Sequence, residues 1–320
     1  NYPGGRFGAA YGQAPNGDLY MYGGYGVDEA KNVGLLGNLW KFDGQNWTWL
    51  SGDKLMNQQS VRTSSPRVTP VSTTRPGGRF QSSLWVDESY NVYVFGGSFD
   101  INTYLDHQEN LQDLMKWDGV NWSWEGGSQQ KNKLEVESNG LPFWPASRRG
   151  AAGVYKDGKF YMLGGFGYGT GGGINPNPYF GDLWTWEPSG WTKIHSTDDP
   201  NTPIRSANNS LFFIGNNLYY YGVSRWTVAY KVVYDENGSI SVDSSIDYVN
   251  DANLYRWNSD STWTLVESYG TASNYSSIGP VGLYHHNVAP LDVGSNMGIV
   301  SNGQEAYLFG GQEDYNSTNI

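Results

Sequence analysis

Five stretches decide the fold: LYMYGG (19–24), VYVFGG (92–97), FYMLGG (160–165), LYYYGV (218–223) and AYLFGG (306–311). Each is a run of aromatic and aliphatic residues that ends in Gly-Gly or a near equivalent. A pattern that recurs in this way indicates that one supersecondary unit has been copied along the chain. The other parts of the repeated unit lie on either side of each Gly-Gly.

Each of the first four units begins with an Arg that leads into a strand of small residues. A turn rich in Asn, Asp and Gly, residue types that tolerate positive φ, joins this strand to the aromatic strand. After a long variable connection come a third strand, as in NLWKFD (38–43), and a tight hairpin to a fourth, as in WTWL (47–50). This order of parts predicts a four-stranded antiparallel meander in every unit.

Radial packing of such sheets forms a β-propeller, in which small residues suit the crowded axis and aromatic residues fill the widening space between sheets. The leading Arg, the aromatic run into Gly-Gly and the Trp of the outer hairpin also resemble the kelch repeat, over nearly the whole chain. The resemblance is closer to the long-repeat, Trp-rich variety of extracellular and bacterial kelch-like proteins than to the compact intracellular variety. We predict an all-β, kelch-like β-propeller of four-stranded antiparallel blades. The expected full blades span residues 6–50, 79–125, 148–194 and 205–266, and a partial fifth spans 281–320.

Two features depart from the kelch pattern. Successive Gly-Gly pairs stand farther apart than the roughly 50 residues of a kelch repeat, and the excess falls in the connections. The fifth unit ends after its second strand. We therefore expect a single propeller domain, 1–320, that is part of a longer chain.

Composition removes several classes of function. The 320 residues carry a formal net charge of −11 and include no Cys. A negative chain repels phosphate, which argues against a nucleic-acid partner. Without Cys there is no disulfide, thiolate metal site or Cys nucleophile. No apolar run approaches the roughly 20 residues that span a bilayer, so we expect no membrane span in this chain.

The residues show no catalytic constellation. His285 and His286 are adjacent on an expected strand, where their side chains point to opposite faces and suit a shared metal poorly. Among kelch-like enzymes, chemistry like that of galactose oxidase requires a Cys crosslinked to Tyr. The iron motif of nitrile-specifier-like proteins is matched by Glu109 and Asp113, but Trp117 stands where its His is required. We predict a non-enzymatic protein with no cofactor and no metal.

Alternating strand direction places the long connections together at one end of the sheets. Long ordered loops on a rigid scaffold usually carry recognition, so this end is the candidate binding surface. Neutral variation in loop length is the alternative. Aromatic side chains in these loops either bind sugars or a protein partner, or form small cores beneath the loops. The candidates are Trp144, Tyr168, Tyr179, Trp226 and Tyr230.

The leading Arg of each repeat has two interpretations. A ring of guanidinium groups would hold a carboxylate ligand. Alternatively, each Arg pairs with a carboxylate or carbonyl of an adjacent blade and fixes blade register. We favour the second, because the fifth unit has Val293 at this position. The residues are Arg6, Arg79, Arg148 and Arg205.

Asn-x-Ser/Thr triplets bear on location, although a chain rich in Asn, Ser and Thr contains several by chance. Two lie at equivalent hairpins between the third and fourth strands, and three lie in long connections or near the end. Asn208 lies on an expected innermost strand, and we expect it to be unmodified. Glycans are expected at Asn46, Asn121, Asn237, Asn274 and Asn316.

We predict a non-enzymatic extracellular or cell-surface glycoprotein module for protein–protein interaction or structural assembly. Its partner is another protein or a second copy, at the long-connection end or at the incomplete last blade. The alternative is a carbohydrate-binding or carbohydrate-processing propeller, which needs a pocket with at least two convergent carboxylates and an exposed ring at the axis mouth. A third possibility, an intracellular kelch adaptor, would leave Asn46 and Asn121 unmodified.

Overall fold

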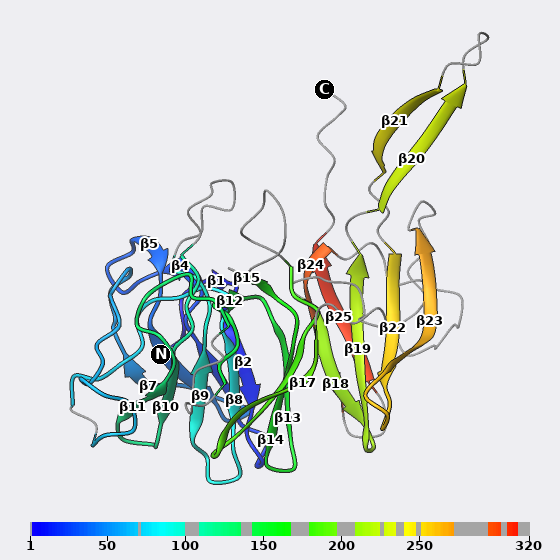
Figure 1. The fold of residues 1–320 in the computed structure, drawn as a ribbon. Helices are drawn as coiled ribbons and strands as arrows, with labels where there is room; N and C mark the ends of the chain where they lie inside the picture. The colour runs from blue at the N-terminus through cyan, green and yellow to red at the C-terminus, as the bar shows by residue number, and fades with distance from the viewer. Residues whose placement is uncertain are drawn as a thin grey trace. The chain divides into compact units, whose positions relative to one another are not determined.

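The computed structural model describes residues 2–69, 72–99, 109–135, 143–167, 179–196, 209–224, 227–234, 240–247, 251–271, 294–301 and 306–312. Within these ranges every regular element is a β-strand (Figure 1). The chain divides into two compact units, Asn1–Thr202 and Pro203–Ile320.

The first unit contains three four-stranded antiparallel sheets, with strand orders β2-β3-β6-β7, β8-β9-β10-β11 and β13-β14-β16-β17. The strands of the first sheet are Ala10–Gln13, Leu19–Tyr22, Asn38–Phe42 and Trp47–Gly52. Those of the second are Ser83–Val86, Val92–Phe95, Leu114–Trp117 and Trp122–Gly126. Those of the third are Ala152–Lys156, Lys159–Leu163, Leu183–Glu187 and Gly190–His195. The predicted four-stranded antiparallel sheet is therefore confirmed for each of these repeats.

The second unit repeats the pattern. The fourth repeat forms the sheet β18-β19-β22-β23, whose strands are Ser210–Ile214, Asn217–Ser224, Asp251–Trp257 and Trp263–Thr271. The described part of the fifth repeat is a hairpin of β24 (Gly294–Ser301) and β25 (Ala306–Gln312), and β24 lies against β18.

Parts of the long connections are regular, contrary to the expectation of loops. Between β19 and β22, β20 (Thr227–Tyr234) pairs with β21 (Ile240–Asp247) as a separate two-stranded ribbon. In the first repeat, β4 (Tyr25–Val27) and β5 (Val33–Leu35) follow Gly-Gly, and in the third repeat β15 (Phe166–Gly167) does so. β4 and β15 form because the backbone past Gly-Gly pairs with the residues that begin the same repeat, and β5 pairs with β4.

That partner is the leading Arg segment, which the sequence had placed inside the first strand of the sheet. β1 (Arg6–Phe7) instead pairs with β4, and β12 (Arg148–Arg149) pairs with β15. Figure 1 shows β1, β4, β5, β12 and β15 gathered at one end of the strands of the first unit. This is the end that carries the long connections, and we call it the long-connection end.

A bend separates the Arg segment from the innermost strand. The bend residue has φ of 63° at Gly8, 55° at Gln81 and 63° at Gly150, all in the left-handed region that glycine adopts most easily. The bends also join neighbouring repeats, since Gln81 N donates to Gly8 O at 2.7 Å and Gly150 N donates to Gln81 O at 2.8 Å. A line of backbone hydrogen bonds therefore crosses the three repeats.

The core of the first unit lies between adjacent sheets. β2 lies against β8, and β8 lies against β13. Between the second and third sheets, the ring of Trp85 stacks on that of Phe160 with centroids 4.0 Å apart, and Trp184 and Trp191 are buried beside them. Such aromatic pairs contribute about 0.5–1.5 kcal/mol beyond the burial of their area.

The repeated Gly-Gly has a direct structural cause. Gly96 and Gly97 have φ of 62° and 91°. A Cβ on Gly96 would lie 2.6 Å from the carbonyl oxygen of Arg148, while Gly97 N donates a 2.8 Å hydrogen bond to that same oxygen. The first repeat makes the same approach to Arg79. The Gly-Gly pair thus binds each repeat to the Arg peptide of the next.

Candidate functional site

The leading Arg side chains are held within their own repeats. In the third repeat, the guanidinium of Arg148 donates to both carboxylate oxygens of Asp182, at 2.7 and 2.8 Å, and to the carbonyl oxygen of Gly164 at 2.9 Å. Both charged side chains are buried. Burial alone would raise the pKa of the Asp182 carboxyl, but the Arg148 charge and the hydrogen bonds from Arg148 and Trp184 together outweigh burial, and the pKa is lowered. The aspartate is therefore ionised and paired.

The first and second repeats build the same contact with different atoms. Arg79 donates to the two oxygens of Asp113 at 3.0 and 3.1 Å. Arg6 donates at 2.7 Å to the amide oxygen of Asn38, the uncharged equivalent. In each case a further hydrogen bond reaches the first glycine of the repeat's own Gly-Gly.

Each of these carboxylate or amide side chains also accepts a hydrogen bond from a second donor. The indole of Trp184 donates to Asp182 at 2.6 Å, and the indole of Trp40 donates to Asn38 at 3.0 Å. Met115 occupies this position in the second repeat. There Arg62, from the connection before the repeat, donates to Asp113 at 2.6 Å instead.

These contacts differ from the expected pairing with an adjacent blade. The carboxylate partner lies in the same repeat, and the neighbouring repeat is reached through the Arg backbone, since Arg79 N donates to Leu36 O at 3.2 Å. In the described repeats the guanidinium groups are used in this structural contact, which disfavours the ring of Arg as a ligand site. Arg205 lies outside the described residues.

The predicted loop aromatics are dispersed. Trp144 packs on the core between the second and third sheets and covers Gly126, where any side chain would overlap its ring. Tyr179 bridges to Phe166 with ring centroids 5.0 Å apart. Both contacts favour the small-core interpretation. Tyr168 and Trp226 lie outside the described residues, and Tyr230 is placed on β20 by its backbone alone.

An apolar face on the small sheet β1-β4-β5 is the surface that sequence reasoning missed. Phe7 pairs with Tyr25, and Val27 pairs with Val33, so all four residues lie on one face by the two-residue period of strands. Phe7 and Val33 are each 54% exposed and Val27 is 39% exposed. We call these four residues the apolar face. Tyr25, Val27 and Val33 lay in a stretch expected to be loop, and Phe7 lay in a segment expected to belong to the first strand of the four-stranded sheet.

Aromatic contacts continue from this face across the neighbouring repeats. Phe7 packs edge-on against Phe80 with centroids 5.5 Å apart. The guanidinium of Arg149 lies 6.0 Å from the ring of Phe80 and 5.2 Å from that of Phe166. Phe7, Phe80 and Arg149 each follow a leading Arg, so the repeat itself places this row at the long-connection end.

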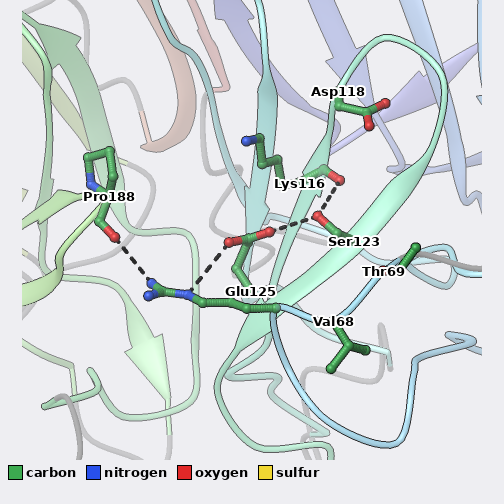
Figure 2. Close-up of a pocket in the computed structure, with 8 residues that line it drawn as sticks. Val68, Thr69, Lys116, Asp118, Ser123, Glu125 and Pro188 are labelled. Carbon is green, nitrogen blue, oxygen red and sulfur yellow. Dashed lines mark hydrogen bonds and ion pairs between the residues drawn. The ribbon is translucent and has the colours of Figure 1, made fainter.

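A polar hollow of about 480 Å³ lies elsewhere, beside the outer strands β10 and β11 (Figure 2). Arg67 crosses it, with Nη2 donating to Pro188 O at 3.3 Å and Nε 3.7 Å from a carboxylate oxygen of Glu125. The hydroxyl of Ser123 donates to the other oxygen of Glu125 at 2.7 Å. The remaining lining residues are Val68, Thr69, Lys116 and Asp118.

The two predicted glycosylation hairpins have the same local structure. The carboxylate of Asp43 accepts hydrogen bonds from the backbone N of Gln45 and Asn46, and Asp118 does the same for Val120 and Asn121. Asn46 is exposed and Asn121 is partly exposed. The other triplets begin at positions outside the described residues: Asn208, Asn237, Asn274 and Asn316.

The structure adds no catalytic evidence. Across the described ranges, no three His, Cys, Asp or Glu side chains gather as a metal site would require. No helix long and apolar enough to cross a membrane occurs in the same part of the chain.

Comparison with known proteins leaves the family open. No family model matches the sequence, and no curated protein matches it. A solved structure titled "Structure of YjhT" is similar over 82% of this chain and 71% of that chain, with 17% sequence identity and a TM-score of 0.47.

Proposed function

We propose that the chain is a non-enzymatic extracellular or cell-surface glycoprotein module that binds another protein or a second copy through its long-connection end. The apolar face carries this proposal. Contiguous exposed apolar side chains on a soluble protein mark interaction surfaces, whereas scattered ones do not. Phe7, Val27 and Val33 are exposed together on one face of one small sheet. Because these side chains are exposed, packing of the core does not explain why they are apolar.

The scaffold of this proposal is a kelch-like β-propeller of four full blades and a partial fifth. Two observations support it within the first unit. The innermost strands follow one another in chain order, β2 against β8 and β8 against β13. The same backbone hydrogen bond joins each Gly-Gly to the next Arg, at Gly24 and again at Gly97. An identical join between successive sheets is what radial repetition requires.

A protein partner fits this end better than a carbohydrate does. The carbohydrate alternative requires convergent carboxylates beside an exposed ring where the innermost strands begin. The side chains that flank the bends there are instead aromatic, amide or guanidinium groups, at Phe7, Phe80, Gln81 and Arg149. Phe7 is the exposed ring of this row, whereas Phe80 and Arg149 are buried behind it. Aromatic side chains are enriched at protein interfaces, so Phe7 suits a protein partner.

The extracellular location rests on the acceptor triplets. Asn46 and Asn121 lie on short hairpins at the end away from the long connections. A glycan on either hairpin would leave the apolar face clear for a partner.

Site-specific photo-crosslinking tests the function. A photoreactive amino acid replaces Val33 in the apolar face, and a matched variant carries it at Val120, which is 74% exposed on a hairpin. In the native source, we expect the Val33 variant to form a covalent adduct with another polypeptide or a second copy, and the Val120 variant to form none. Equal adducts at both positions, or none at Val33, would contradict the proposal.

A further inference from the structure

The polar hollow lies on the same face of the second sheet as Asn121. Lys116 pairs with Ser123 across β10 and β11, and Trp117 pairs with Trp122. Because side chains alternate between faces along a strand, Lys116, Asp118, Asn121 and Ser123 share one face and the two Trp share the other. The hydrogen bond from Asp118 N to Asn121 O, at 3.1 Å, closes the hairpin at the edge of that face. Asn121 is therefore paired with Asp118, a residue that lines the hollow.

The lining suits a sugar. Val68 and the ring of Pro188 offer apolar surface, while Thr69, Lys116 and Glu125 offer hydrogen-bonding groups (Figure 2). Arg67 lies across the hollow, and its own backbone is fixed, since Arg67 N donates to Trp124 O at 2.7 Å. Ligand sites combine apolar surface with a few fixed polar groups. A sugar matches such a lining, because its C–H faces and acetamido methyl are apolar while its hydroxyl and amide groups form hydrogen bonds.

We propose that this hollow seats the first sugars of an N-linked glycan attached to Asn121. The inference rests on the proposed glycoprotein and adds a specific contact to it: Arg67 and Glu125 hydrogen-bond the glycan, and Val68 and Pro188 cover its apolar side. The attachment is the ordinary one at Asn-x-Ser, with Ser123 completing the triplet.

The first repeat provides a natural control. Asn46 lies on the equivalent hairpin, with Asp43 in the place of Asp118. The lining differs: Glu125 lines the hollow in the second repeat, whereas Leu50 stands at the equivalent position in the first repeat. A glycan on Asn46 therefore begins beside a surface that lacks this carboxylate.

The experiment measures the rate at which peptide N-glycosidase releases each glycan from the folded, natively glycosylated protein. One charge-assisted hydrogen bond of about 1.4 kcal/mol corresponds to about tenfold, so we expect release at Asn121 to be about tenfold slower than at Asn46. Arg67→Ala should bring the Asn121 rate to that of Asn46, and Lys116→Gln should raise it by a smaller factor. Lys41→Ala, at the equivalent of Lys116 in the first repeat, should leave the Asn121 rate unchanged.

Release after denaturation should be equal at the two sites in every variant, which removes intrinsic differences between the acceptor sequences. Equal native rates at Asn121 and Asn46, or a slow rate that Arg67→Ala and Lys116→Gln both leave unchanged, would overturn the inference. A glycan on Asn46 with none on Asn121 would overturn it and leave the glycoprotein proposal standing. The absence of glycans from both would overturn the two together.

Discussion

At the scale of single residues, the molecule depends on one repeated contact between a leading Arg and an acid or amide at the start of the third strand. Arg148 and Asp182 make this contact with both side chains buried. Removing one partner of a buried pair leaves an uncompensated charge and costs about 3–5 kcal/mol. We expect Asp182→Asn to lower the free energy of unfolding of the first unit by about that amount, measured by urea denaturation.

The first repeat already carries Asn at the equivalent position, which supplies the control. There Arg6 is less buried than Arg148, and its neutral partner Asn38 suffices. Asn38→Asp should therefore change the stability far less than Asp182→Asn does. A large and equal effect at both positions would show that burial is not the deciding factor.

The same pair predicts a dependence of stability on pH. The folded protein holds the pKa of Asp182 below the ordinary value of the carboxyl group, because the Arg148 charge and the hydrogen bonds from Arg148 and Trp184 together outweigh burial. The stabilisation is present above that ordinary value, about 3.9, and is lost as the pH falls towards the lower folded pKa. The free energy of unfolding of the unmodified chain should fall between about pH 5 and pH 3. The free energy of unfolding of the Asp182→Asn variant should fall less steeply over the same range. Parallel slopes would assign the acid sensitivity to other carboxylates.

Gly96 tests why Gly-Gly recurs. Gly96→Ala places a methyl group 2.6 Å from Arg148 O in addition to the strain of positive φ. Gly158→Ala is the matched control, since Gly158 has φ of 82° and open space around it. We expect about 1–2 kcal/mol of destabilisation for the control and about 1–3 kcal/mol more for Gly96→Ala, by thermal unfolding. Equal effects would mean that φ alone requires glycine.

At the scale of elements, the two-stranded ribbon β20–β21 is the largest departure from the expected loops. In TVAYKVVY (227–234), Val and Tyr recur at every second position, which is typical of a strand. The segment was nevertheless expected to be loop, because it lies inside a long connection. Replacing Thr227–Asp247 by a short turn should leave the β18-β19-β22-β23 sheet folded, because the ribbon pairs only with itself in the described sheets. Circular dichroism and the melting temperature are the readout. Loss of the cooperative transition would show that the ribbon supports the sheet.

At the scale of the whole molecule, local patterns predicted the sheets and long-range contacts escaped prediction. The aromatic run, the turn residues and the outer Trp hairpin are each contained within one repeat, and the four-stranded sheets follow from them. Arg62 donates a hydrogen bond to Asp113, and Arg67 donates one to the carbonyl oxygen of Pro188. Both partners lie far away in the sequence, and no local pattern identifies them. The apolar face depends on the bend at Gly8, which directs Phe7 away from the innermost strand.

We infer that this scaffold works as an extracellular glycoprotein module. Intact-mass and glycopeptide analysis of the natively purified protein tests this inference. We expect N-linked glycans on Asn46 and Asn121, at the two equivalent hairpins, and an unmodified Asn208. A protein from its native source that carries no glycan at either hairpin would contradict the claim and favour an intracellular adaptor.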